Sequence, residues 1–435
     1  MHQYSSPAAT FFSSLKSLFC LSPSTPRHPS PAPLRARYAS QIANPPPHSL
    51  QRSPSQHHLN CSCEQPHPLE PSYIPAFEPP IRRNEKRIKL EVMTRELMIP
   101  SSTYTAFASG PDGKTFVEKH LELPALGRND VAIAILCCSV CFTDTMYAAQ
   151  LEGSVVGHEI IGRVEFKGES VTNVNVGDIV GFGYIRSTCL ECQYCLQGQE
   201  NMCPKRTTFS DGVGGFANAS VWDSRFVYKI PETIEPRHAG PLTCAGATVF
   251  AALYGYNVSP TSTVGIVGMG GLGHLAIKFA KAWGCKVVAI SSSRDKEHDA
   301  RAFGAHEFVC TQDPIATSTK MDYILNTVSG DLPWETFINL LETNGTLINM
   351  GVSAKGSMEI PYFPHLFKQL KVVGSLVASR HVVKKMLDFA ALHSIKPEIE
   401  ELDMDVKGCR EAFRRVTEQR ARYRVVLNVP PRLAL

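Results

Sequence analysis

A glycine-rich turn at residues 268–273 restricts the fold of this chain more than any other feature of its sequence. Residues 264–267, just before it, form a short apolar run typical of a buried strand. After it, apolar residues recur at helical spacing from Leu272 to Trp283, which predicts a helix. In this context a Gly-x-Gly-x-x-Gly turn lets the backbone approach a pyrophosphate, which the free N–H groups of the helix start then face. We therefore predict a dinucleotide site that contains Gly268, Gly270, Gly271, Leu272 and Gly273.

The chain after Cys244 alternates between predicted strands and predicted helices. The strands expected there are residues 264–267, 286–290, 307–309, 322–325, 346–350 and 372–377. Such alternation predicts a doubly wound parallel sheet of the Rossmann type, with right-handed crossovers. A helix over 381–392 and a strand over 424–429 follow, and the β character of that strand predicts that it rejoins an earlier domain.

The end of the second strand of this unit predicts which dinucleotide binds. An NAD site usually has an acidic residue there that accepts hydrogen bonds from the ribose hydroxyls. This chain has hydroxyls and cations instead, and Asp295 lies several residues beyond the strand. We therefore predict NADP(H), with its 2′-phosphate bound by Ser291, Ser292, Ser293, Arg294 and Lys296.

Four cysteines in the first half of the folded part have the spacing of a metal site. They are Cys189, Cys192, Cys195 and Cys203. Two residues between cysteines let both sulfurs face one ion, and four thiolates complete a closed structural zinc site. We predict one zinc ion there.

The residues around these cysteines indicate a different fold from the second half. Short β-like runs at 131–136, 160–166 and 179–182 are separated by Gly and Asp, which predicts a small, turn-rich β-barrel. The predicted fold class is thus α/β plus β. The predicted domains are residues 99–240, the parallel-sheet domain 241–378, and a return to the first domain over 379–435.

Residues 1–98 differ from the rest of the chain because they are rich in Pro and Ser and contain no acidic residue before Glu64. Such a segment buries too little apolar surface to order itself, so disorder is expected. Two other interpretations stay open: a mitochondrial presequence, and translation that begins at Met93 or Met98.

Composition excludes several classes of function. A formal net charge of +4 is too small to indicate a nucleic-acid partner, and no apolar run is long enough to span a membrane. The cysteines outside the predicted zinc sites show no disulfide spacing, which favours a reducing, cytoplasmic location; a mitochondrial one is the alternative if the first residues are a presequence.

Several motifs resemble those of the zinc-dependent medium-chain alcohol dehydrogenases, and most closely their cinnamyl-alcohol-dehydrogenase-like branch. In chain order they are Cys141-Phe142-Thr143-Asp144, Gly157-His158-Glu159, the four-cysteine run, Gly214-Gly215-Phe216-Ala217, Pro241 to Thr248, the glycine turn, Ile290 to Ser293, and Arg422-Tyr423-Arg424.

The resemblance implies a GroES-like catalytic barrel with an inserted Rossmann domain, two zinc ions per chain, and residue roles that spacing alone does not assign. It implies that Cys141, His158 and Cys244 bind the catalytic zinc and that Thr143 relays a proton. It also implies that Asp144 orients His158, that Glu159 approaches the metal, and that Thr248 contacts the cofactor. The implied reaction is hydride transfer between NADP(H) and an aromatic or medium-chain alcohol/aldehyde pair, in a homodimer.

Two departures from the family pattern are visible. Met146 stands where the family often has a histidine, and the segment from Cys141 to His158 is several residues shorter than usual. These departures motivate an alternative hypothesis of a catalytically silent NADP(H)-binding zinc protein.

Overall fold

The computed structural model describes residues 103–434 except 316–319, 331 and 353–356. The predictions for residues 1–98 therefore lie outside the described residues. Within the described part the strands form a parallel sheet, a largely antiparallel sheet and two small hairpin-like sheets.

The parallel sheet has six strands in the order β12-β11-β10-β13-β14-β15. Its strands are β10 (Thr263–Val267), β11 (Lys286–Ser291), β12 (Glu307–Cys310), β13 (Met321–Asn326), β14 (Leu341–Asn349) and β15 (Lys371–Gly374). Every neighbouring pair is parallel, and the order is that of a dinucleotide-binding sheet whose strand order reverses beside β10. The predicted Rossmann unit is confirmed.

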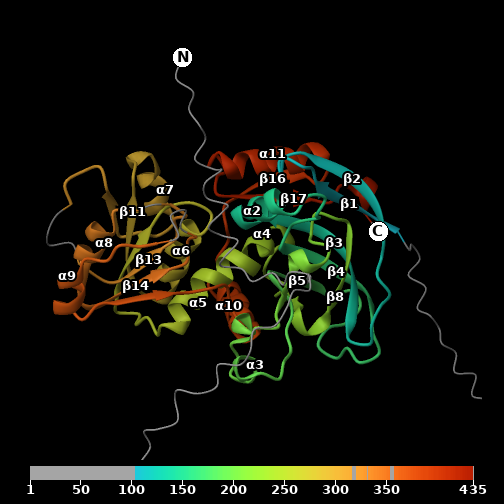
Figure 1. Cartoon of the computed structure of the whole chain (residues 1–435), viewed down its shortest axis with the longest axis horizontal. Coiled ribbons are helices and arrows are strands. Elements are labelled where there is room, and N and C mark those ends of the chain that lie inside the picture. The colour runs from blue at the N-terminus through green and yellow to red at the C-terminus, as the bar shows by residue number, and fades with distance from the viewer. Residues whose placement is uncertain (1–102, 316–319, 331, 353–356, 435) are drawn as a thin grey trace, which may run out of the picture. The chain divides into compact units, whose positions relative to one another are not determined.

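Helices precede or connect these strands, and most of them bury apolar residues in the clusters on the faces of the sheet (Figure 1). They are α5 (Ala247–Gly255), α6 (Gly273–Trp283), α7 (Glu297–Ala302), α8 (Trp334–Leu340) and α9 (Tyr362–Phe367). α6 buries Leu275, Ala276 and Phe279 against the sheet, which is the apolar stripe predicted from helical spacing. Gly284 ends this helix in the left-handed conformation, with φ at 102°.

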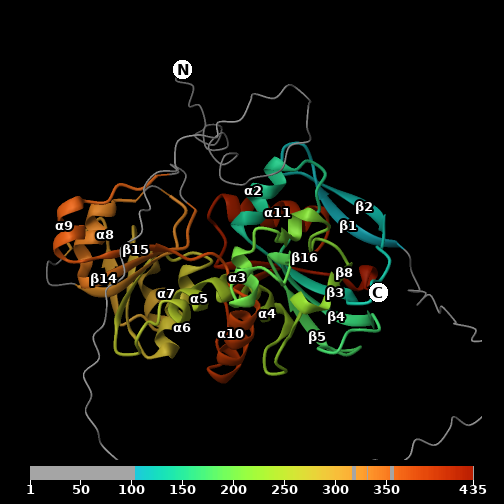
Figure 2. The ribbon, with the colours of Figure 1, turned by 60° about the horizontal axis from the view of Figure 1, so that its bottom comes forward.

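The largely antiparallel sheet is built from both ends of the described chain. Its strands are β3 (Asp130–Val140), β4 (Glu159–Lys167), β5 (Ile179–Phe182), β8 (Ala219–Asp223), β9 (Tyr228–Lys229), β16 (Ile399–Asp403) and β17 (Arg424–Asn428). β17 pairs antiparallel with β3, so the last strand rejoins the first domain as predicted. Figure 2 shows the C-terminal strand among the blue-green strands of the first domain.

The remaining elements frame these two sheets. They are β1 (Thr103–Ser109), β2 (Phe116–Glu122), α2 (Phe142–Gln150), β6 (Ile185–Ser187), α3 (Gln193–Leu196), β7 (Thr207–Thr208), α4 (Pro236–Pro241), α10 (Arg380–Leu392) and α11 (Val406–Thr417). Short 3-10 or π segments lie at Glu200–Met202, Phe209–Asp211, Ser224–Phe226, Leu242–Gly246, Arg294–Lys296 and Pro431–Leu433.

Observed boundaries differ from the predicted ones in a few places. β15 ends at Gly374, three residues before the predicted end, and Val377 has a positive φ of 41° that does not continue a strand. β3 extends to Val140 because it pairs with β4 and β17 over its second half. None of the described helices has both the length and the apolar composition needed to cross a bilayer.

Candidate metal centres and dinucleotide site

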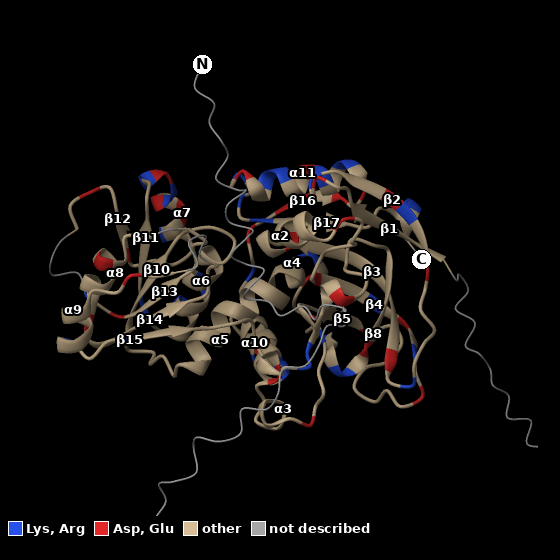
Figure 3. Ribbon diagram, in the orientation of Figure 1, with Lys and Arg blue, Asp and Glu red and all other residues tan. Residues whose placement is uncertain are grey.

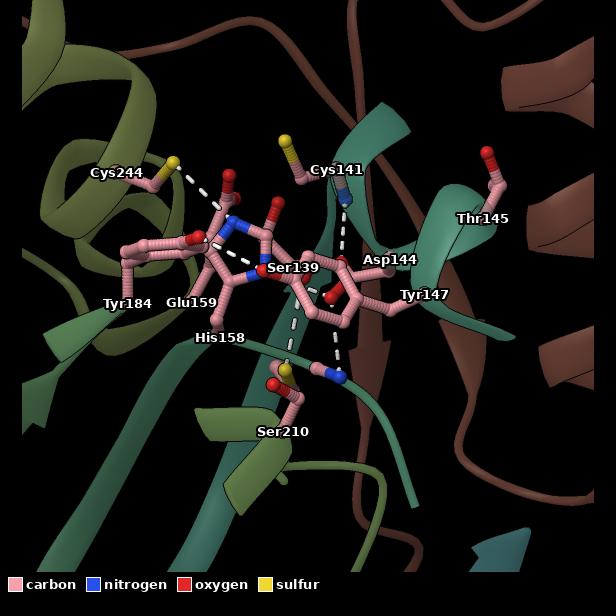
Figure 4. Close-up of polar contacts among 12 residues, drawn as sticks. Ser139, Cys141, Asp144, Thr145, Tyr147, His158, Glu159, Tyr184, Ser210 and Cys244 are labelled. Atoms are coloured by element: carbon pink, nitrogen blue, oxygen red, sulfur yellow. Dashed lines mark hydrogen bonds and ion pairs between the residues drawn. The ribbon is translucent and has the colours of Figure 1, made fainter. Parts of the chain in front are cut away.

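The first candidate site is a buried cluster of four ligand atoms from Cys141, His158, Glu159 and Cys244. These atoms lie within 4.8 Å of one another (Figure 4). Cys141 precedes α2, His158 and Glu159 stand at the start of β4, and Cys244 lies in the π segment Leu242–Gly246. The fold thus brings together all three predicted ligands of the catalytic zinc and the predicted nearby carboxylate.

Asp144 fixes the orientation of this cluster from the first turn of α2. Its Oδ1 lies 2.7 Å from His158 Nδ1, and neither side chain is exposed to solvent. The Cys141 N–H donates to Asp144 Oδ2 over 2.9 Å, which is the capping contact of the helix. Nδ1 of His158 is occupied by its contact with Asp144. The other ring nitrogen, Nε2, faces Cys244 and lies 3.3 Å from the Cys244 Sγ. This is the arrangement that a histidine ligand of zinc requires.

The second candidate site contains the four predicted structural cysteines. Thiolates bind zinc at about 2.3 Å, so the edges of a tetrahedral four-sulfur site are about 3.8 Å long. The Sγ–Sγ distances are 3.9 Å from Cys189 to Cys195, 3.5 Å from Cys189 to Cys203, and 3.6 Å from Cys192 to Cys195. The donor set and its spacing therefore fit a closed zinc site.

The donor chemistry of the first cluster also fits zinc. Two thiols and one imidazole are the ligands of an open zinc site that keeps one position for substrate. One carboxylate oxygen at this cluster, Glu159 Oε2, is buried without a hydrogen-bond partner among the described residues. A cation held by Cys141, His158 and Cys244 would lie close to the Glu159 carboxylate.

The predicted dinucleotide turn joins β10 to α6. Gly268 has a φ of 92°, which only glycine adopts without strain. A Cβ on Gly273 would lie 2.0 Å from the Gly268 carbonyl oxygen, so the helix and the turn approach each other too closely for a side chain. Lys296 Nζ donates to the Met269 carbonyl oxygen over 3.2 Å, so the Lys296 ammonium group lies beside the turn.

The other predicted cofactor residues are distributed around this turn. Ser291 ends β11 and is nearly buried, Ser293 caps the following 3-10 turn, and Ser292 is exposed. Arg294 forms ion pairs with Glu297 and Asp313, so its charge is already engaged. Leu272 directly precedes α6, and Thr248 is buried in α5.

Both domains of the chain resemble known protein families. The model of the zinc-binding dehydrogenase family matches residues 271–391, and that of the alcohol dehydrogenase GroES-like domain matches residues 127–232. An aldehyde reductase from Synechocystis is 37% identical over 313 residues, which cover 70% of this chain and 92% of that protein. The chain belongs to the zinc-binding alcohol dehydrogenase family.

Two solved structures extend the comparison to the branch that the motifs predicted. A cinnamyl alcohol dehydrogenase from Sorghum bicolor has a TM-score of 0.71 and 32% identity, and the match covers 75% of this chain and 97% of that chain. A cinnamyl alcohol dehydrogenase from Helicobacter pylori, solved with NADP(H), has a TM-score of 0.70, 28% identity and coverage of 75% and 98%. The predicted family and the predicted fold of a GroES-like domain with a Rossmann domain are confirmed.

The local charges of the dehydrogenase favour a metal-binding thiolate. A hydrogen bond from Cys244 lowers the pKa of Cys141 well below its ordinary value, against the effect of burial, and the positive charges of His158 and Arg424 lower it further. The same contact with Cys141, together with burial, raises the pKa of Cys244. Cys141 is therefore the first of the two thiols to lose its proton, and thiolate is the form that binds metal.

Arg424 connects the metal cluster to the glycine turn, a connection that sequence reasoning did not predict. Its Nη2 pairs with Glu159 Oε1 in the interior of the dehydrogenase. Burial raises the pKa of Glu159, although the Arg424 charge opposes this effect. On the other side, a Cβ on Gly271 would lie 2.7 Å from Arg424 Nη1, so Gly271 leaves room for the guanidinium. The Arg422-Tyr423-Arg424 motif marked this place in the sequence but did not reveal its contacts.

The predicted proton-relay residue, Thr143, is half-buried in the first turn of α2, and Met146 is half-buried one turn further on. Three aromatic residues also border the cluster and were not predicted. Phe209 and Tyr184 contact the His158 ring, with ring centroids 4.8 and 5.7 Å away, and Tyr147 contacts both of them. No local pattern distinguished these rings from ordinary core residues.

The two cysteine clusters lead to a prediction on metal content. Purified wild-type protein should contain two zinc ions per chain, and Cys192→Ser and Cys244→Ser should each contain one. Only Cys192→Ser should also melt at a clearly lower temperature, because a closed structural site contributes its binding free energy to folding. Metal analysis by mass spectrometry and a thermal melt would measure both effects.

Cys310→Ser is the matched control, since Cys310 is a buried thiol on β12 outside both clusters. It should keep two zinc ions per chain. Two zinc ions in either ligand variant would contradict the assignment of that cluster.

Proposed function

We propose that this protein is a zinc- and NADP(H)-dependent alcohol dehydrogenase that reduces aromatic or medium-chain aldehydes. The observation that carries the proposal is the buried Cys141–His158–Cys244 cluster, which Arg424 connects to the dinucleotide turn through Glu159. The aldehyde reductase and the two cinnamyl alcohol dehydrogenases among its relatives support the substrate class. The proposed domain boundaries remain residues 99–240, 241–378 and 379–435.

The residues of the chain have distinct proposed roles in this reaction. Zinc bound by Cys141, His158 and Cys244 would supply a Lewis acid for the carbonyl oxygen, and NADPH would supply the hydride. Asp144 holds His158 in the tautomer that presents Nε2 to the metal. Thr143 would pass a proton from solvent to the carbonyl oxygen, which the reduction needs in addition to the hydride. Glu159, neutralised in part by Arg424, places a carboxylate beside the metal ligands.

The preference for NADP(H) rests on the end of β11. Ser291 occupies the position where an NAD-dependent protein usually has a carboxylate. Lys296 lies beside the glycine turn and supplies a positive charge for the 2′-phosphate, whereas Arg294 is held by Glu297 and Asp313. We propose that Lys296 and the serines contribute more to phosphate recognition than Arg294 does.

A cytoplasmic location is proposed from the thiol chemistry. All eleven cysteines within the described ranges are free of disulfide bonds, which is typical of a reducing compartment.

The experiment that tests the function is a reductase assay on the full-length chain. Oxidation of NADPH should be followed by its absorbance with a panel of aliphatic and aromatic aldehydes, and NADH should be measured in parallel. We expect turnover with a preference for NADPH. Bound zinc and bound NADPH without turnover on any aldehyde would instead support a catalytically silent protein of the same fold.

A carboxylate introduced at the end of β11 tests the cofactor choice. Ser291→Asp should raise the KM for NADPH by about tenfold or more, because a charge at this position repels the 2′-phosphate and favours free ribose hydroxyls. The KM for NADH should stay the same or fall. Ser292→Asp, at the exposed neighbour, is the control and should have a smaller effect. Equal effects on both cofactors would contradict this assignment.

A homodimer is proposed from an apolar surface at one edge of the parallel sheet. Tyr362, Phe363, Leu366 and Phe367 of α9 are 69, 66, 51 and 75% exposed, and β15 is the terminal strand of that sheet. Figure 3 shows α9 without a charged residue. An exposed apolar patch beside an open strand edge is typical of a subunit interface.

Sedimentation velocity tests the dimer. The wild-type protein should sediment as a dimer, and Phe367→Glu should shift it to the monomer because a carboxylate cannot be buried in that interface without a partner. Leu392→Glu is the matched control, since Leu392 is 78% exposed on α10. A dimeric Phe367→Glu variant or a monomeric wild-type protein would contradict the proposal.

A further inference from the structure

Two tyrosine hydroxyls form a bridge beside the metal cluster. Tyr147 Oη and Tyr184 Oη are 2.8 Å apart, and their rings meet edge to face with centroids 6.5 Å apart. Tyr147 lies on α2, and Tyr184 lies between β5 and β6. The bridge therefore connects two segments that the chain brings together only through folding.

The bridge stands directly against a predicted zinc ligand. The Tyr184 ring meets the His158 ring at 83° with centroids 5.7 Å apart, and Figure 4 shows the Tyr184 hydroxyl directed toward that of Tyr147. Phe209 is fully buried and packs against Tyr147, Tyr184 and His158. The two tyrosines remain partly exposed. Phe209 is thus the inner support of an aromatic wall, and the two tyrosines are its partly exposed members.

The position of Tyr147 is well fixed by the start of α2. Asp144, in the first turn, is held by the Cys141 N–H and by His158. Tyr147 follows three residues later, so it lies above Asp144 on nearly the same face of the helix. Its hydroxyl then meets Tyr184. Consequently the wall is anchored to the same carboxylate that orients the metal ligand.

The segment that carries Tyr147 lies between two predicted zinc ligands. α2 occupies Phe142–Gln150 of the residues between Cys141 and His158. Tyr147 reaches from this helix across to Tyr184 and so places an aromatic ring on this side of the cluster.

We propose that the Tyr147–Tyr184 bridge is the size filter of the substrate pocket, admitting medium chains and single aromatic rings and excluding wider, fused-ring aldehydes. This inference rests on the proposed function, because it assumes that the carbonyl oxygen binds at the Cys141–His158–Cys244 cluster. Tyr147 is a specificity-determining residue: its ring packs against Phe209, which itself contacts the predicted ligand His158, and the hydrogen bond to Tyr184 prevents the ring from swinging away.

The test compares binding of unreactive substrate analogues, so that it does not depend on turnover. Propionamide and 2-naphthamide are primary amides with a carbonyl oxygen and differ in bulk. Their Kd values for the zinc-loaded full-length chain with NADPH should be measured by calorimetry. We expect wild type to favour propionamide, and Tyr147→Ala to shift the ratio of Kd values by about tenfold or more toward 2-naphthamide, as expected for space opened in an apolar pocket.

The conservative variants separate the ring from the hydroxyl. Tyr147→Phe and Tyr184→Phe keep both rings but remove the bridge, so each should shift the ratio in the same direction by only about two- to fivefold, a range below the full pocket effect. Tyr254→Ala, which removes a tyrosine ring 38% exposed on α5, should leave the ratio unchanged. Zinc content and NADPH affinity should match the wild type in all four variants.

The outcomes distinguish the inference from the proposed function. An unchanged ratio in Tyr147→Ala, with zinc and NADPH still bound, would overturn the size filter even if aldehydes are reduced. A shifted ratio in a protein that reduces no aldehyde would support the size filter and overturn the proposed activity. An equal shift in Tyr254→Ala would also overturn the inference, because the effect would then not be specific to the wall.

Discussion

The carboxylate of Asp144 is the contact on which the candidate metal centre depends. It accepts hydrogen bonds from the Cys141 and Gly157 backbone amides and lies against His158 Nδ1. One buried side chain thereby caps α2, fixes the strand entry at β4 and orients an imidazole. A charge buried this deeply is tolerated only with such complete pairing. The same capping contact sets the direction of α2 and, with it, the position of Tyr147.

A second buried ion pair extends this organisation to the dinucleotide site. Arg424, on the C-terminal strand β17, pairs with Glu159 beside the metal ligands and lies against Gly271 of the glycine turn. Because β17 also pairs with β3, the last strand of the chain connects the metal-binding sheet to the cofactor turn. The return of the C-terminus to the first domain therefore has a direct role in assembling the site.

Much of the fold could be predicted from local patterns. The strand–turn–helix unit around Gly268, the alternation after Cys244 and the return of residues 424–428 to β structure all appear in the structure. The end of β15 was predicted less well, since an apolar run continues past Gly374 while the backbone turns at Val377. Hydrophobicity alone does not encode that change of direction. The family resemblance, and not spacing, selected Cys141, His158 and Cys244.

The sequence by itself determined the features that depend on neighbouring residues: the four-cysteine spacing, the glycine turn, and the absence of a carboxylate at Ser291. These are local because two to five residues set the geometry of each. The tertiary structure alone decided which distant groups meet: Arg424 with Glu159, Tyr147 with Tyr184, and Phe209 with His158. Such contacts follow from strand register and helix direction, and a change in either moves a side chain to another face, so no local spacing reveals them.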